Sequence, residues 1–473
     1  MSFRKIAATF LLALALMNAG KGKAQDAPSP LTPNQQFARD ILKELIEINT
    51  TDTPAGNVTA AAEAVAARMR AAGFPTEDVK VLGPVPTKGN LVVRLRGKNG
   101  GKPLLFLAHL DVVQALREDW SMDPFKLNEA GGYFYGRGTL DIKGAAAGLA
   151  ATFIRLKKEG WTPPRDLILA LTADEEGGQY NGVQWLAENH RDLIDAEYCI
   201  NTDAGNFESM DGKRLLLGIQ TSEKNYVDFH LEVKSSGGHS SRPVKAENAI
   251  YHLAAGINRL ADFDFPVHLT ETTHDFFERA APLQTDPETA KNFRAVAHDP
   301  HDREAVAFLS RTPYFNALLH TTCVATRLEA GHANNALPQT ARANVNCRML
   351  PGEPLQQVQD QLKRVLADDR IAITVDGNFV PAPASPINPI IVRKLEELGG
   401  KLYGGLPVVP VMDAGASDSK YTRIAGIPTY GVPGIFADEG DDRAHGRDER
   451  IRVKDFYDGL EFYYQFMQSL ARP

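Results

Sequence analysis

The feature that most constrains the fold is a continuous apolar segment that ends in consecutive acids. Residues 166–173 read Asp-Leu-Ile-Leu-Ala-Leu-Thr-Ala, and Asp174, Glu175 and Glu176 follow directly before two glycines. An uninterrupted apolar run of this length is typical of a parallel strand that helices cover on both faces. Three acids at the end of a buried strand are costly unless cations neutralise them. The segment therefore predicts an α/β sheet with a polar site at one strand end.

Helical and strand-like patterns alternate around this run. Apolar residues at helical spacing predict helices from about Phe37, over 59–72 and over 143–158, with strands over 90–95 and 103–109. This alternation indicates an α/β domain with a mostly parallel central sheet. The same pattern resumes from about Pro386.

The intervening segment has a different pattern. Residues 226–233 alternate between apolar and polar, as a strand with one solvated face does. A helix, two strands, a helix and a strand are predicted at 247–260, 322–328, 341–349, 355–366 and 371–375. This β-α-β-β-α-β order is typical of a compact α+β unit with its helices on one face of an antiparallel sheet. The polar segment 265–313 is interpreted as an insertion with short helices, lying within this smaller domain.

These patterns give the domain boundaries. We expect a signal peptide over 1–24, a catalytic domain in two parts over 25–219 and 381–473, and an inserted lid domain over 220–380. Arg4 and Lys5 precede a short apolar run in the signal segment, and the run is shorter than the roughly 20 residues that span a bilayer. A cleavable signal, and hence a secreted or periplasmic protein without a stable membrane span, is favoured over a membrane anchor.

Charge and cysteine content narrow the function. The 473-residue chain has a formal net charge of -7, and no basic stripe is evident in it. A nucleic-acid-binding role is therefore excluded. Cys199, Cys323 and Cys347 form no Cys-x-x-Cys pair, which makes them poor zinc ligands. An exported chain allows disulfides, although the odd number leaves at least one thiol free, and the interpretation as buried small residues is favoured.

Further polar residues follow other strand-like runs. His109 and Asp111 come after one run, Asp203 after another, Asp141 stands between glycines before a helix, and His445 lies near the C-terminus. Imidazoles and carboxylates are the ligands of hydrolytic zinc sites, and strand ends are where α/β sheets place their sites. Each residue alone has a structural alternative, such as a buried histidine or an N-cap aspartate.

Taken together, these stretches resemble the di-zinc metallopeptidases that include glutamate carboxypeptidase, aminoacylase and succinyl-diaminopimelate desuccinylase. The matching stretches are LLFLAHLDVV, YGRGTLDIKG, LTADEEGG, NTDAG, GGHSSRP, NNALPQTARANVNCR, GASDS and AHGRDE. They occur in family order over nearly all of the chain after the signal segment. The resemblance implies a zinc-dependent hydrolase of amide bonds that acts on a small peptide or an N-acyl amino acid.

The resemblance also implies two Zn²⁺ ions per subunit, in sites that Co²⁺ or Mn²⁺ can also fill. The implied ligands are His109 and Asp203 for one ion, Glu176 and His445 for the other, and Asp141 as the bridge. Glu175 would be the general base and Asp111 would orient His109. A cis peptide bond is implied at Asp141-Ile142.

Four more residues take roles from the resemblance. His239 would stabilise the oxyanion, Asn335 and Arg348 would hold the substrate, and Ser417 would lie on a substrate loop. In relatives the lid domain forms a homodimer, so His239 would act across subunits unless the insertion replaces the partner. Two other hypotheses stay open, a di-zinc aminopeptidase without a lid and a non-catalytic peptide-binding protein on the same fold.

Overall fold

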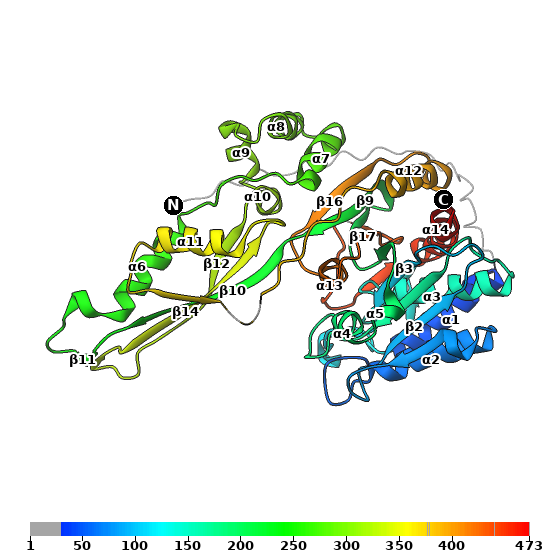
Figure 1. Ribbon diagram of the computed structural model, residues 1–473, viewed down its shortest axis with the longest axis horizontal. Coiled ribbons are helices and arrows are strands. Elements are labelled where there is room, and N and C mark those ends of the chain that lie inside the picture. The colour runs from blue at the N-terminus through cyan, green and yellow to red at the C-terminus, as the bar shows by residue number, and fades with distance from the viewer. Residues whose placement is uncertain (1–29, 376, 378, 439, 473) are drawn as a thin grey trace, which may run out of the picture.

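The computed structural model describes residues 30–375, 377, 379–438 and 440–472. It has two parts, a large sheet enclosed by helices and a smaller elongated sheet that extends away from it (Figure 1). The expected signal peptide at 1–24 lies outside the described residues. Within those residues, no helix is both long and apolar enough to cross a membrane.

The large sheet is mixed, with a parallel centre. Its strand order is β1 (Val79–Leu82), β2 (Asn90–Leu95), β6 (Leu167–Thr172), β3 (Leu104–His109), β7 (Tyr198–Asn201), β17 (Thr429–Gly431), β9 (Lys213–Glu223), β8 (Asn206–Met210) and β18 (Phe436–Asp438), and β16 (Val408–Asp413) pairs with β9. Strands β6, β3, β7 and β17 are parallel neighbours. The carboxyl ends of these four strands therefore meet at one edge.

Helices cover both faces of this sheet, which explains the apolar run at β6. Leu167, Leu169 and Leu171 pack into one core, and Ile168 and Ala170 pack into another on the opposite face. The first core includes residues from α1 (Pro33–Glu47), α2 (Val58–Ala71), α3 (Lys143–Lys158), α12 (Pro389–Tyr403) and α14 (Val453–Ala471). The second lies under α4 (Gly182–Asn189), α5 (Arg191–Ile194) and α13 (Ser419–Ile424). The α/β fold class is confirmed.

The smaller sheet is antiparallel and has the predicted β-α-β-β-α-β order. Its strands are β12 (Thr322–Ala330), β14 (Thr340–Met349), β10 (Asn225–Lys234) and β15 (Ala372–Val375), in that spatial order. Helices α6 (Ala249–Ala261) and α11 (Leu355–Leu366) share its apolar core. A short pair, β11 (Gly238–His239) with β13 (Ala336–Leu337), forms the distal tip (Figure 1).

The insertion differs from its predicted placement. It contains α7 (Glu271–Ala280), α8 (Pro287–His298), α9 (Arg303–Leu309) and α10 (Pro313–Leu319). It interrupts the smaller domain in sequence, as predicted, but its apolar core includes Val409, Val411 and Met412 of β16 in the large sheet. The Thr221 and Thr272 hydroxyls are 2.6 Å apart across this contact. The phenylalanine-rich faces of α7 and α8 pack against the large sheet because β16 offers them an apolar surface.

A third, three-stranded sheet lies beside the polar edge of the large one. It consists of β4 (Asn128–Ala130), β5 (Tyr133–Tyr135) and β19 (Arg450–Arg452), with β5 in the centre. Because β5 and β19 pair, Gly136 and Arg137 lie next to the segment that precedes β19. This pairing joins two chain segments that are about 300 residues apart in sequence.

The interpretation of the cysteines is corrected in part. Cys199 is a buried free thiol, as interpreted, but Cys323 and Cys347 form a disulfide. The two residues face each other in the register of β12 and β14. Sequence spacing does not reveal such a pairing, because it depends on which strands become neighbours.

We expect the denatured protein to titrate as one thiol without reductant and as three after reduction. Replacing both Cys323 and Cys347 with serine should lower the free energy of unfolding of the smaller domain. The closed loop separates the cysteines by 24 positions, for which loop entropy gives about 3 kcal/mol. Ellman titration and urea unfolding are the measurements. Cys199→Ala is the control, since it removes the free thiol and leaves the bond intact. Three thiols before reduction would contradict the pairing.

Candidate metal centre

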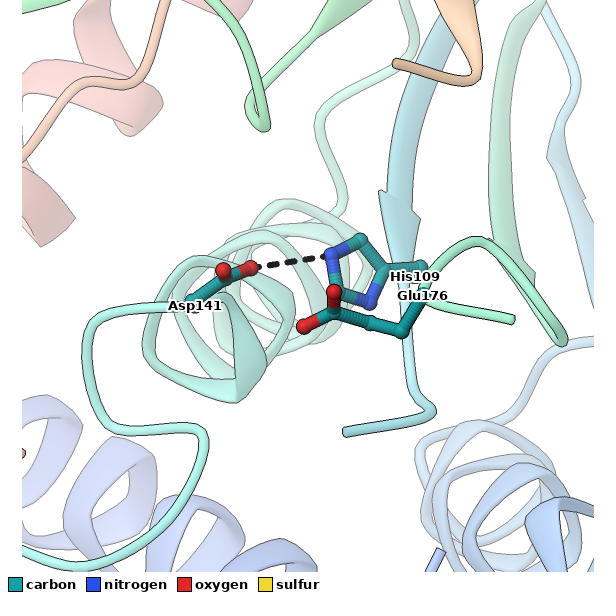
Figure 2. Close-up of side chains that lie close together, drawn as sticks. All are labelled: His109, Asp141 and Glu176. Carbon is teal, nitrogen blue, oxygen red and sulfur yellow. Dashed lines mark hydrogen bonds and ion pairs between the residues drawn. The ribbon is translucent and has the colours of Figure 1, made fainter. Parts of the chain in front are cut away.

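Three parallel strands deliver most of the predicted ligands to one edge. His109 is the last residue of β3, Glu175 and Glu176 follow β6, and Asp203 follows β7. Because β6, β3 and β7 are adjacent and parallel, their carboxyl ends lie side by side, where α/β sheets place their sites. His109 points toward Asp141 in Figure 2, and Glu176 lies beside them.

Asp141 and His445 come to this edge from other elements. Asp141 precedes α3 by two residues, and the Asp141-Ile142 peptide bond is cis, as predicted. His445 lies in the segment between β18 and β19 and has a φ of 60°. Non-glycine residues adopt this left-handed backbone at a cost, so neighbouring contacts must hold the His445 segment.

The two oxygens of Asp141 face two different histidines. Asp141 Oδ1 lies 3.1 Å from His109 Nε2, and Asp141 Oδ2 lies 3.1 Å from His445 Nε2. Asp203 Oδ1 is 3.5 Å from His109 Nε2, and Glu176 Oε2 is 2.8 Å from His445 Nε2. The geometry thus gives two groups, one with Asp203 and one with Glu176, that share one carboxylate. A carboxylate shared in this way can bridge two cations.

Asp111 holds the site differently from the expectation. Its backbone carbonyl oxygen lies 3.0 Å from His109 Nδ1 and accepts a hydrogen bond from the Nδ1–H group, which leaves the Nε2 lone pair for a metal. Its carboxylate is 3.7 Å from Nδ1, and it accepts the backbone N–H groups of Glu175 and Glu176 at 3.2 and 2.9 Å. One residue therefore fixes both the tautomer of His109 and the turn that carries the two glutamates.

Burial and crowding raise the pKa values of the two glutamates, whereas the pKa of Asp141 is lowered. Burial, with the nearby Asp203 carboxylate, raises the pKa of Glu175 to about 10. Burial, with Asp141, raises the pKa of Glu176 to about 7. For Asp141, burial raises the pKa, but hydrogen bonds with His109 and His445 outweigh it and hold the pKa below its usual value. The chain thus gathers more buried carboxylates than its own positive charges can balance.

The pKa values of both imidazoles are raised as well. The hydrogen bond with Asp141 raises the pKa of His445 to about 9. Burial lowers the pKa of His109, but the carboxylates of Asp203 and Asp141 outweigh it and raise the pKa well above its usual value. Carboxylates therefore hold both rings in place. A divalent cation bound between a ring and its carboxylates would replace the proton that the raised pKa keeps on that ring.

The donor set fits hard or borderline divalent cations. Ligand atoms of His109, Asp141 and Glu176 lie within 4.8 Å of one another, and so do those of His109, Glu175 and Asp203. Glu176 Oε1 is buried and has no hydrogen-bond partner among the described residues. A buried anionic oxygen without a donor is costly, and a cation would remove that cost. Imidazole and carboxylate ligands suit Zn²⁺ and also Mn²⁺ or Co²⁺.

The four remaining predicted residues lie on other segments of the chain. His239 and Asn335 are exposed at the distal tip, where Ser240 donates its N–H to the Asn335 carbonyl oxygen at 3.0 Å. Arg348 lies on β14 with its guanidinium 4.7 Å from the Tyr226 ring centre. Ser417 is buried and donates to Glu223 Oε2 at 2.8 Å. The tip extends away from the large sheet (Figure 1), so the chain does not bring His239 to its own metal ligands in this structure.

Two buried charges beside the site were not singled out from the sequence. Arg137 and Glu449 form an ion pair of 2.7 Å, and both side chains are almost fully buried. A signal was present, since each lies within four residues of Asp141 or His445 in a stretch that contains glycine.

Comparison with known proteins gives the family. Residues 105–469 match the model of peptidase family M20/M25/M40. The chain is similar to the N-fatty-acyl-amino acid synthase/hydrolase PM20D1 of Xenopus tropicalis, with 31% identity over 377 residues that cover 78% of this chain and 72% of the relative.

Solved structures share the fold. An M20 family metallo-carboxypeptidase from Sulfolobus solfataricus matches with a TM-score of 0.68 and 20% identity, covering 92% of this chain and 99% of that one. A dinuclear metal-binding M20 peptidase of Bacillus subtilis matches with a TM-score of 0.58 and 13% identity, covering 93% of this chain and 97% of that one. At these identities the likeness establishes the fold alone.

The metal-free protein should lose thermal stability as the pH rises from about 5 to about 9. Glu175 and Glu176 have raised pKa values, so their protonated forms stabilise the fold below the unfolded value of 4.5. The contribution of Glu176 is lost as the pH rises through about 7, and that of Glu175 as the pH approaches about 10. The raised pKa of His445 acts in the same direction, with loss as the pH passes 9. Melting temperatures in chelator across this range are the measurement.

Added zinc should remove most of this pH dependence, because cations then balance the ionised carboxylates. The combined Glu175→Gln and Glu176→Gln variant is the control, and its metal-free profile should be flatter than that of the wild type. A melting temperature in chelator that stays constant or rises with pH would contradict this electrostatic account.

Proposed function

The chain belongs to peptidase family M20/M25/M40, and we propose that it releases an amino acid from an N-acyl amino acid or a short peptide at a two-metal centre. It is a hydrolase that acts on amide bonds. The observation that carries the proposal is the placement of Asp141, whose two oxygens face His109 and His445 at 3.1 Å each. This arrangement supports two zinc ions, with His109 and Asp203 on one and Glu176 and His445 on the other.

Glu175 is the general base of the proposed reaction. When bound, the two ions would lower the pKa of water and polarise the scissile carbonyl. The buried Glu175 carboxylate accepts a proton from the attacking water, whose oxygen forms the new bond to the carbonyl carbon. It then returns the proton to the amine nitrogen as the carbon–nitrogen bond breaks. With both ions bound, Glu175 would stay ionised at neutral pH, against the burial that raises its pKa.

Arg348 supports a substrate with a free carboxylate. Its guanidinium lies over Tyr226 on the smaller sheet, and arginine binds carboxylates through two parallel hydrogen bonds. Asn335 would add a polar contact from the tip, and Ser417 would add one from the large domain. The name of the Xenopus relative, an N-fatty-acyl-amino acid synthase/hydrolase, supports an N-acyl amino acid as the substrate class.

A homodimer through the lid domain would complete the site. Strand β12 is one of the two edge strands of the smaller sheet, and Val324 and Leu328 on it are 60% and 64% exposed. An exposed apolar edge strand favours pairing with another strand. Pairing with a second copy would extend the sheet and carry His239 of the partner subunit toward the metals. His239 would then donate to the oxyanion that forms during hydrolysis.

The proposed location is outside the cytoplasm. A signal peptide over 1–24 remains a proposal from the sequence, and the disulfide between Cys323 and Cys347 supports it. Disulfides persist in oxidising compartments such as the periplasm or the exterior. We likewise propose that the catalytic domain comprises 25–219 and 381–473, and that 220–380 forms the lid domain.

The zinc-loaded protein should release free amino acid from N-acyl amino acids or dipeptides that carry a free carboxylate. Matched C-terminal amides should react at least about tenfold more slowly. The amide lacks the charged carboxylate that would accept hydrogen bonds from Arg348. Arg348→Ala should remove that preference. Product release measured by mass spectrometry tests both points.

Glu175→Gln is the control for chemistry in this assay. It should keep two zinc ions by elemental analysis and lose roughly 10²–10⁴ in rate, the usual contribution of a general base. Absence of hydrolysis by the zinc-loaded wild type across the panel would overturn the proposed function. Equal rates on acids and amides would overturn only the role of Arg348.

Mixing two inactive variants should restore activity if the site is shared between subunits. A dimer of one His239→Ala chain and one Glu175→Gln chain contains one site with both residues intact. Random exchange should therefore recover about a quarter of the wild-type sites. Native mass spectrometry verifies exchange, and hydrolysis rates give the recovery. Exchange without recovered activity would show that His239 acts within its own chain.

A further inference from the structure

The ion pair between Arg137 and Glu449 connects the two segments that carry Asp141 and His445. Arg137 follows β5 and Glu449 precedes β19, and these strands pair in antiparallel register. Arg137 Nη1 donates to Glu449 Oε2 at 2.7 Å. The Arg137 guanidinium also lies 5.1 Å from the ring centre of Trp120, which covers it from one side. The pair is thus enclosed next to the metal cluster.

Glu449 binds the backbone of the segment that ends in Asp141. Its carboxylate accepts the N–H groups of Gly138 at 3.0 Å, Leu140 at 2.7 Å and Asp141 at 3.0 Å. Gly138 has a φ of 92°, and a Cβ there would lie 2.9 Å from side-chain atoms of Val112 and Lys143. A glycine is therefore needed for this close approach. Three charge-assisted hydrogen bonds fix where the Asp141 backbone lies.

Arg137 binds the backbone of the His445 segment. Its Nη2 donates to the carbonyl oxygens of His445 at 3.2 Å and Gly446 at 3.0 Å. His445 is largely exposed and has a left-handed backbone, so these two hydrogen bonds help to hold its backbone in place. Arg137 thus links the backbone carbonyl of His445 to Glu449, and the Glu449 carboxylate in turn holds the backbone of Asp141. Lysine has the charge but lacks the fork that reaches both partners.

We propose that Arg137 and Glu449 are positioning residues that set the spacing of Asp141 and His445, and so determine the affinity of the metal that those two residues share. The inference rests on the proposed two-metal function. It adds which residues hold the segments that carry Asp141 and His445 at the second metal position. Partners of this kind, one step removed from the ligands, commonly change metal affinity 10–100-fold when they are replaced.

The experiment measures zinc affinity by competition with a chromophoric chelator, independently of turnover. Arg137→Lys should weaken one zinc equivalent about 10–100-fold and leave the other within about threefold. Glu449→Gln keeps the size of the side chain but removes its charge, and it should weaken both equivalents because Asp141 is shared. Hydrogen exchange in the metal-free Arg137→Lys variant should increase in the 443–447 segment.

A double-mutant cycle with His445→Ala separates positioning from general destabilisation. Once His445 is absent, Arg137→Lys should weaken zinc binding little further, since the ligand that it positions is gone. The matched control is Arg94→Lys, which alters an ion pair of 2.9 Å with Asp166 at the opposite end of β6. This control should leave both zinc affinities unchanged.

The measured zinc affinities distinguish failure of the positioning role from failure of the proposed function. If the wild type binds two zinc ions and both variants bind them equally well, the positioning role is overturned and the proposed function stands. Additive losses in the cycle, with both equivalents weakened alike by Arg137→Lys, also overturn the positioning role. A wild type that binds no second zinc ion overturns the proposed function and this inference with it.

Discussion

Four carboxylates crowd one edge of the large sheet. Glu175, Glu176, Asp141 and Asp203 approach two imidazoles in a region where burial penalises charge. The fully buried strands β3 and β6 supply a rigid base. The adjoining loops, braced by Asp111, Arg137 and Glu449, hold the acids in place. A fold that holds several carboxylates close together is suited to binding cations, because bound cations reduce the repulsion between the carboxylates.

Sequence reasoning predicted the elements that local pattern determines. The bounds of α3 and α11 match the predicted helices, because a periodic apolar stripe specifies a helix without reference to the rest of the chain. Apolar runs likewise located the ends of β3, β6 and β7, and with them the candidates His109, Glu175, Glu176 and Asp203. Their assignment to particular metals came from resemblance to a family, and it remains a proposal.

Features that depend on pairing between distant segments were beyond the sequence. The disulfide requires β12 and β14 to be neighbours in one register. The Arg137–Glu449 pair requires β5 and β19 to pair across about 300 residues. The packing of the insertion on β16 depends on a strand that comes about 100 residues later. In each case the sequence contains the residues, but it does not indicate which distant segment each one contacts, because the tertiary fold determines that contact.

The insertion also bears on how the site is completed. Its core joins α7 and α8 to β16 of the large sheet, and α10 leads directly toward β12 of the smaller one. At the junction of β9 and β10, Lys224 is buried and donates to the His320 carbonyl oxygen at 2.7 Å. Bending the chain so that His239 meets its own metal ligands would break this packing and the hydrogen bonds that Lys224 donates to the His320 carbonyl and to Thr322. These contacts favour rigid spacing of the two sheets, which supports the proposal that a second subunit supplies the histidine.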